Sequence, residues 1–151
     1  MPSVKYYNDG SDFRLPSKRI VTAWLRAAAK AEGYETGDIN YIFCSSEKLL
    51  EINRRFLGHD YYTDVITFDY SDLKDSKTIS GEIYIDTQTV KDNAEQYGIT
   101  PLHEMHRVMI HGVLHLCGYK DKTPSASSRM RSKENTYLKM LSKMFVKPAA
   151  E

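Results

Sequence analysis

Side chains that commonly bind metal ions are concentrated in one short segment, His111-Gly-Val-Leu-His115-Leu-Cys-Gly118-Tyr-Lys-Asp121. On a helix, the spacing of His111 and His115 places both imidazoles on one face, close enough to bind one ion. Gly118 then allows a reversal of the chain that brings Asp121 back toward the same face. Imidazole nitrogens and carboxylate oxygens both bind zinc, and three protein ligands with an open fourth position are typical of catalytic sites. We therefore predict that His111, His115 and Asp121 bind a Zn²⁺ ion.

The chemistry that such a site supports is hydrolysis, because bound zinc lowers the pKa of its water to about 7 and supplies hydroxide near neutral pH. Zinc peptidases also use paired helical histidines, but they carry a glutamate directly after the first histidine as general base. That position is Gly112 here, and no other residue is assigned as general base from the sequence. A pair of hydrogen-bonded core histidines without a metal is the alternative interpretation of the spacing.

The two histidines lie in the most apolar helix that the sequence predicts. Thr100-Pro101 is a strong helix start, because a capping hydroxyl precedes a proline at the first helical position. Between Val108 and Cys117 this helix has almost no polar face, so we expect it to be buried, and its histidines then need partners or a metal. Glu104 either holds a ligand imidazole or marks the solvated end of the helix, and we prefer the second interpretation.

Residue periodicity predicts the elements that surround this helix. Helices are expected at 17–32, 46–57, 87–97 and 124–145, and strands at 3–7, 38–44, 64–70 and 80–86. The polar segment between the last two strands has a length that fits an antiparallel pair better than a crossover. We thus predict one α+β domain over residues 1–151, in which a small mixed sheet of about four strands packs with four to five helices. The central buried helix carries the metal ligands, Trp24 anchors the core, and the tail 147–151 is expected to be disordered.

Composition places the chain among ordinary globular proteins. It has 151 residues, of which 41% are hydrophobic and 27% charged, in the range of a soluble domain. No apolar run approaches the roughly 20 residues of a membrane span, and the N-terminus lacks the apolar region of a secretory signal. Cys44 and Cys117 are far apart and are expected to be reduced thiols in a cytoplasmic protein. The net charge of +1 neither favours nor excludes nucleic acid, which needs a local basic patch.

Three motifs in the same order resemble those of a known family. The segment 111–119 resembles the signature of the YbeY family of bacterial endoribonucleases, His-Gly-x-Leu-His-Leu-x-Gly-Tyr-Asp-His. Upstream, Thr63-Asp-Val-Ile-Thr-Phe68 is similar to the family's Thr-Asp-Val-Leu-Ser-Phe strand, and Gly81-Glu-Ile-Tyr-Ile85 is similar to its Gly-Asp-Ile-x-Ile strand. Together the motifs cover roughly residues 40 to 135. The resemblance implies a cytoplasmic α+β zinc protein that cleaves single-stranded RNA in ribosomal RNA maturation and ribosome quality control, with ribosomal RNA and the ribosome as partners and no membrane.

The resemblance also assigns site residues, with two departures. The family's first two histidine ligands fall on His111 and His115, while its third falls on Asp121, where a carboxylate replaces an imidazole without the loss of a ligand. The family usually has an arginine where this chain has Leu57. Arg54 and Arg55 are both close enough in the sequence to replace it, and Arg55 is our predicted catalytic cation, which would offset charge on the phosphorane. The alternative is that this arginine complements the helix dipole and faces solvent.

Two other classes of function stay open at this point. A zinc hydrolase of another substrate, such as a peptidase, would use the same ligands. A ribosome-associated protein without catalytic activity would use the metal only for structure.

Overall fold

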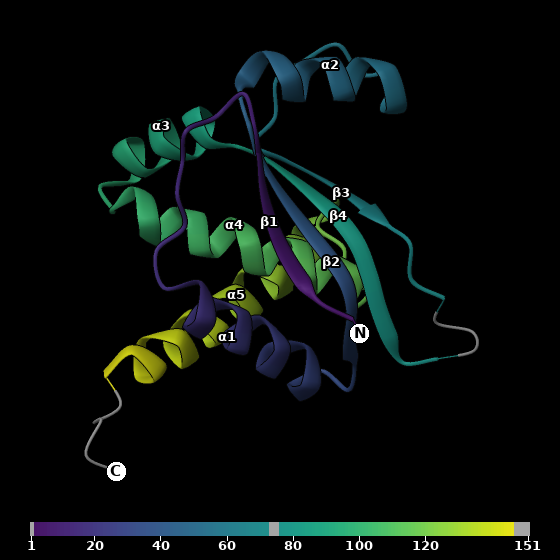
Figure 1. The fold of residues 1–151 in the computed structure, drawn as a ribbon, viewed down its shortest axis with the longest axis vertical. Helices are drawn as coiled ribbons and strands as arrows, with labels where there is room; N and C mark the ends of the chain where they lie inside the picture. The colour runs from purple at the N-terminus through teal and green to yellow at the C-terminus, as the bar shows by residue number, and fades with distance from the viewer. Residues whose placement is uncertain (1, 73–75, 147–151) are drawn as a thin grey trace.

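The computed structural model describes residues 2–72 and 76–146, and these residues form five helices and a four-stranded sheet (Figure 1). The predicted α+β class is confirmed. Every expected helix and strand is present, with bounds shifted by a few residues at most. The elements in chain order are β1 Val4–Asp9, α1 Lys18–Ala31, β2 Glu35–Cys44, α2 Ser46–Leu57, β3 Val65–Asp69, β4 Thr78–Asp86, α3 Thr87–Tyr97, α4 Pro101–Leu116 and α5 Pro124–Val146.

The sheet is mixed, as predicted, with the strand order β1-β2-β4-β3. β1, β2 and β4 run parallel, and β3 pairs antiparallel with β4, as the short connection between them predicts. Side chains of β4 alternate between the two faces of the sheet: Ile83 and Ile85 enter the main core, whereas Tyr84 packs in a smaller cluster beneath α2. β3 therefore forms one edge of the sheet.

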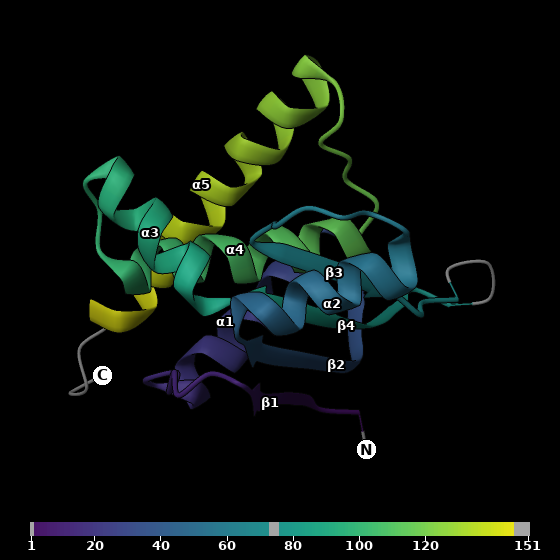
Figure 2. The same cartoon turned by 90° about the horizontal axis from the view of Figure 1, so that it is seen from above.

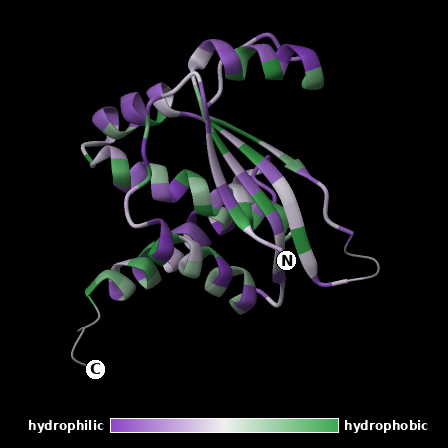
Figure 3. Cartoon of the chain, viewed as in Figure 1, coloured by the Kyte–Doolittle hydropathy of each residue, from purple (hydrophilic) through white to green (hydrophobic). Residues whose placement is uncertain are grey.

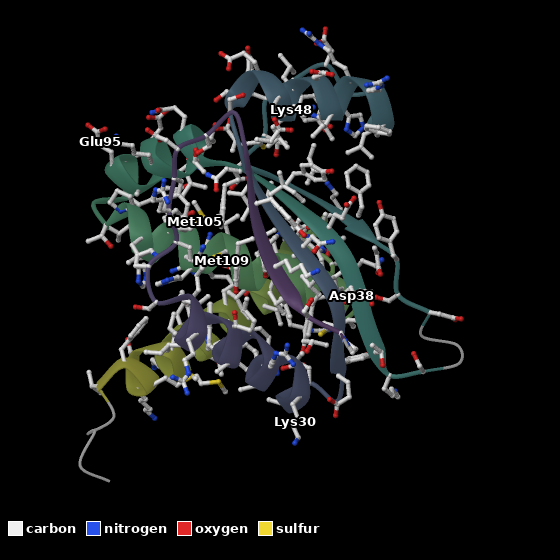
Figure 4. The ribbon with its side chains drawn as sticks, viewed as in Figure 1. Lys30, Asp38, Lys48, Glu95, Met105 and Met109 are labelled. Atoms are coloured by element: carbon white, nitrogen blue, oxygen red, sulfur yellow. The ribbon has the colours of Figure 1, made fainter. Side chains whose placement is uncertain are left out.

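The helices cover the two faces unequally. α1 and α4 pack on one face of the sheet, and α5 packs against both of them (Figures 1 and 2). α2 contacts β3 and β4 from the other face. Met105 and Met109 of α4 lie inside the molecule, while Lys30 at the end of α1 lies at its surface (Figure 4). α4 is thus the buried central helix that the sequence predicts.

Local signals place the start of α4 and its distance from the sheet. The hydroxyl of Thr100 accepts a hydrogen bond from the backbone N–H of His103 at 3.1 Å, and Pro101 occupies the first turn. Gly112 lets α4 approach β4 closely, because a Cβ at this position would lie 2.7 Å from Cδ1 of Ile83. The helix that carries the histidines is therefore held tightly against the sheet.

Other predictions about the core are confirmed. Trp24 is fully buried, and its indole N–H donates a hydrogen bond to the backbone oxygen of Tyr137 at 2.6 Å. Cys44 and Cys117 are buried free thiols. Among the described residues, no helix is both long enough and apolar enough to span a membrane. The tail 147–151, for which disorder is expected, lies outside the described residues.

Candidate metal centre

The structure brings the three predicted ligands together. Nε2 of His111 lies 3.3 Å from Oδ2 of Asp121, and Nε2 of His115 lies 3.4 Å from the same oxygen. The three ligand atoms all lie within 4.8 Å of one another. The side chains are 18% to 29% exposed, so solvent reaches the cluster from one side. Two nitrogens and one carboxylate oxygen in this arrangement are a suitable donor set for a divalent metal ion.

Helix geometry and a tight turn produce this convergence. His111 and His115 are successive residues on one face of α4, with ring centroids 4.5 Å apart. α4 ends at Leu116, and two residues later Gly118 has φ of 102°, a conformation that favours glycine. Its backbone N–H bonds to the oxygen of His115 at 2.9 Å. The reversal returns Asp121 to the histidine face, as the sequence predicts.

Both imidazoles are oriented through their other ring nitrogen. Nδ1 of His111 lies 2.7 Å from Oε2 of Glu134, and Nδ1 of His115 lies 3.0 Å from the backbone oxygen of Tyr119. Since both partners can only accept, each Nδ1 carries a proton and each Nε2 is the ring nitrogen that faces the cluster. This arrangement of outer partners is typical of metal-binding histidines.

Glu134 is a site residue that our sequence reasoning missed. It lies on α5 among the buried side chains Met130, Tyr137 and Leu138, and it is only 4% exposed. A carboxylate on the apolar face of an amphipathic helix is costly to bury without a partner. The position of Glu134 on this face was the signal in the sequence, because a buried carboxylate requires a cation or a strong hydrogen-bond donor on the element against which α5 packs.

Our interpretation of Glu104 as the solvated end of the helix is wrong. Glu104 is 5% exposed, and its Oε1 lies 3.6 Å from Nε of Arg107. Arg107 also donates from Nη1 to Oε1 of Glu134 at 3.2 Å. The structure gives Glu104 no contact with a ligand imidazole, and the role of imidazole partner belongs to Glu134. The partly buried Arg107 thus links the two glutamates from α4 and α5.

The electrostatics of the cluster favour a bound cation. Burial disfavours the charged form of His111, but the hydrogen bond and charge of Glu134, with Asp121 and Asp64, outweigh it and raise the pKa of His111. Burial, followed by the charge of His111, lowers the pKa of His115. The carboxylates that favour a proton on His111 would equally favour a metal ion in its place. The residues present therefore fit a divalent metal.

The cluster opens into a cavity of about 610 Å³ between α4, β3, the turn after α4 and the start of α5. Its wall includes the cationic side chains of Lys120, Lys122 and Arg131, all of them exposed. Asp64 faces the cavity from the segment before β3, and burial raises the pKa of this carboxyl. The cavity is thus open to a substrate and bordered by positive charge on one side.

Arg55 lies elsewhere. It is in the last turn of α2, on the other face of the sheet, with its side chain 71% exposed and 3.8 Å from the carboxylate of Glu51. It does not belong to the wall of the cavity, which Arg107 and Arg131 reach instead. The prediction of Arg55 as catalytic cation rested only on its proximity to Leu57 in the sequence.

Gly112 faces away from the cluster. A side chain added there would meet Ile83 in the main core rather than the cavity. A glutamate at this position, as in zinc peptidases, would not fit between α4 and β4. The close packing of α4 against β4 therefore excludes the glutamate that acts as general base in zinc peptidases.

Fold and site together define a small α+β protein whose central helix and following turn present a His-His-Asp group, able to hold one metal ion, to a solvent-open cavity. Residues 6–142 match the family described as endoribonuclease YbeY, and the chain belongs to that family. The resemblance seen in the three sequence motifs is confirmed.

Relatives of known name support the same assignment along nearly the whole chain. The chain is 47% identical over 141 residues to endoribonuclease YbeY of Parabacteroides distasonis, which covers 92% of this chain and 96% of the relative. It is 46% identical over 138 residues to endoribonuclease YbeY of Bacteroides thetaiotaomicron, covering 91% and 98%. The solution structure of TM1509 from Thermotoga maritima is similar with a TM-score of 0.62 and 26% identity, covering 97% of this chain and 99% of that one.

Proposed function

We propose that this chain is a zinc-dependent endoribonuclease that cleaves single-stranded RNA and acts on the ribosome in ribosomal RNA maturation and quality control, in the cytoplasm. The observation that carries this proposal is the convergence of His111, His115 and Asp121 at a solvent-open cavity. The names of the relatives support RNA as the substrate. We propose residues 1–151 as one functional domain.

The ion and the chain have separate tasks in this proposal. When bound to His111, His115 and Asp121, zinc supplies a Lewis acid for a phosphodiester oxygen. Glu134 and the backbone oxygen of Tyr119 hold the imidazoles in the binding orientation.

Positive side chains around the cavity attract the RNA backbone. Lys120, Lys122 and Arg131 border the cavity, and their exposed ends would contact phosphate oxygens by charge-assisted hydrogen bonds, although Arg131 also lies 3.8 Å from the carboxylate of Glu134. The charge-offsetting role of Arg55 stays a prediction, and it requires a movement that brings the guanidinium round the edge of the sheet. In the absence of that movement, Arg131→Ala should reduce cleavage more than Arg55→Ala.

The decisive experiment compares metal content and cleavage of a single-stranded RNA in the wild type, Asp121→Ala and Asp121→His. We expect Asp121→Ala to lose bound zinc and cleavage together, because two histidines alone form an incomplete site. Asp121→His replaces one zinc ligand with another and should retain the metal. Elemental analysis and gel-resolved cleavage products provide the two readouts.

His115→Ala tests the assignment of the histidine ligands. RNA cleavage that persists in this variant, with unchanged metal content, would contradict the proposed site. A purely structural metal is tested by chelation, since structural zinc contributes directly to folding. A chelated protein that stays folded but no longer cleaves RNA supports a catalytic ion over a structural one.

A further inference from the structure

Aromatic side chains are exposed where α2 ends and the chain continues toward the cavity. Phe56, Tyr61 and Tyr62 are 63%, 55% and 62% exposed. With His59 they form what we call the aromatic loop, defined as residues Phe56, His59, Tyr61 and Tyr62. In Figure 3, the green of hydrophobic residues extends to the end of α2, at the outer surface. Rings exposed together in one segment contribute little to the core and point to a binding surface.

The rings of the aromatic loop are ordered by one another and by their neighbours. The His59 and Tyr61 rings are stacked with centroids 5.1 Å apart, and the Tyr61 hydroxyl lies 2.9 Å from Nδ1 of His59. The Phe56 ring meets Phe68 edge-on at 6.0 Å. Below the loop, the side chain of Asn53 donates to the backbone oxygen of Tyr61 at 2.9 Å. Phe56 and Tyr61 are therefore held in place while more than half of each side chain is open to solvent.

The chain leads directly from the aromatic loop to the candidate metal centre. Thr63, Asp64 and Val65 follow Tyr62 directly in the chain, and all three line the cavity. A strand of nucleotides that lies across the aromatic loop would therefore meet the cavity next. The segment joins α2 on one face of the sheet to β3 at its edge, so it leads from one face to the other.

Charge near the aromatic loop is present but largely balanced. The Arg55 guanidinium lies over the Phe56 ring, 5.9 Å from its centroid, and 3.8 Å from the carboxylate of Glu51. Arg54 is paired with Asp60. The chemistry on offer is thus ring stacking with cation–π support rather than a run of free positive charges.

We propose that the aromatic loop binds the unpaired bases of single-stranded RNA by stacking and guides the strand to the metal centre. This inference rests on the proposed function, whose substrate it makes specific. In a duplex the faces of the bases are covered by their neighbours, so a stacking surface selects single strands. Stacking is tolerant of base identity, which suits an enzyme that reads strandedness rather than one sequence.

The test measures binding separately from cleavage. Metal-loaded protein is titrated into a labelled single-stranded 2′-O-methyl uridine oligomer, which resists hydrolysis, and binding is followed by fluorescence anisotropy. Tyr61→Ala/Tyr62→Ala should weaken binding by about tenfold or more. Tyr61→Phe/Tyr62→Phe keeps both rings and should bind like the wild type. The matched control is Tyr97→Ala, because Tyr97 is 59% exposed at the end of α3 and should be dispensable.

An abasic oligomer of the same length and the fully paired duplex complete the experiment. Both should bind the wild type more weakly than the uridine oligomer, and the double alanine variant should bind them like the wild type. Unchanged affinity of the double alanine variant for the uridine oligomer would overturn the proposal, whatever its rate of cleavage. If instead the wild type binds through the loop but cleaves no RNA, the proposed function fails and the stacking surface stands.

A second copy of the chain is the competing occupant of this surface. Sedimentation of wild type and Tyr61→Ala/Tyr62→Ala distinguishes the two. A wild-type dimer that becomes monomeric in the variant, with unchanged RNA affinity, would overturn the proposal in favour of self-association. A wild type with the same mass as the variant, together with weaker RNA binding by the variant, supports it.

Discussion

Replacing Glu134 by glutamine should weaken zinc binding without removing a ligand. The Glu134 carboxylate is 5% exposed in its side chain and lies 2.7 Å from Nδ1 of His111. Glutamine keeps the shape and a hydrogen-bond acceptor but loses the negative charge that favours a cation on the imidazole. Loss of such an outer partner typically costs about 10- to 100-fold in metal affinity. A factor of 10 to 100 corresponds to about 1.4 to 2.7 kcal/mol.

The chain offers a close control for this change. Glu104 is as buried as Glu134 and also pairs with Arg107, at 3.6 Å, but the structure gives it no contact with His111 or His115. Competition with a fluorescent zinc chelator, at fixed pH, would give the affinities of wild type, Glu134→Gln and Glu104→Gln. We expect Glu104→Gln to stay within about threefold of the wild type, since it loses only a pairing with an arginine that keeps its other partner.

Two results would contradict this role of Glu134. Wild-type affinity in Glu134→Gln would show that the 2.7 Å contact does not support a bound ion. Equal losses in both variants would show that the pairing of both glutamates with Arg107, and not the imidazole contact, controls the metal site. Circular dichroism of the metal-free variants separates either outcome from unfolding.

Three further predictions test the surroundings of the site. Burial lowers the pKa of His106 to about 4 from its ordinary 6.5. The contribution of His106 to the free energy of unfolding should therefore be fully present above pH 6.5 and fall by about 3 kcal/mol as the pH drops to 4. Urea unfolding of His106→Phe should lack this pH-dependent loss. Tyr119→Phe removes a 2.7 Å hydrogen bond to Glu32 and should lower the free energy of unfolding by about 1.5 to 3 kcal/mol in the same assay. Zinc affinity should stay unchanged, because His115 bonds to the backbone oxygen of Tyr119, which the substitution keeps. Gly112→Ala places a Cβ 2.7 Å from Cδ1 of Ile83 and should lower the free energy of unfolding by about 1 to 3 kcal/mol. If the clash is the cause, adding Ile83→Val to the Gly112→Ala chain should recover part of this loss.

Local signals made the elements and the ligands predictable. The Thr100-Pro101 start, the apolar run of α4 and Gly118 each act over a few residues, so their consequences can be read without the tertiary fold. The pairing of His111 with His115 needs only the helix, and the return of Asp121 needs only the turn. These parts of the site follow from spacing.

Contacts between separate elements were not predictable in the same way. Glu134 reaches His111 across 23 positions, and Arg107 reaches Glu134 across 27. Both contacts depend on how α5 crosses α4, which neither helix specifies alone. The same lack of information made Glu104 look solvated, because nothing in its own helix shows that α5 covers it. The exposure of Tyr61 and Tyr62 likewise depends on where α2 ends above the sheet.

A carboxylate as the third metal ligand would change the charge of the site, and positive side chains in the same turn would offset that change. Asp121 adds a negative charge where the resemblance places a neutral imidazole, and Glu134 adds another beside His111. An RNA phosphate approaching a divalent ion held in this way would meet less attraction than at a site of three histidines. Lys120 and Lys122 flank Asp121 in the chain and both border the cavity, so positive charge accompanies the substitution in the same turn. Both lysines are exposed, and their charge would add to the positive field that an approaching RNA phosphate meets at the cavity.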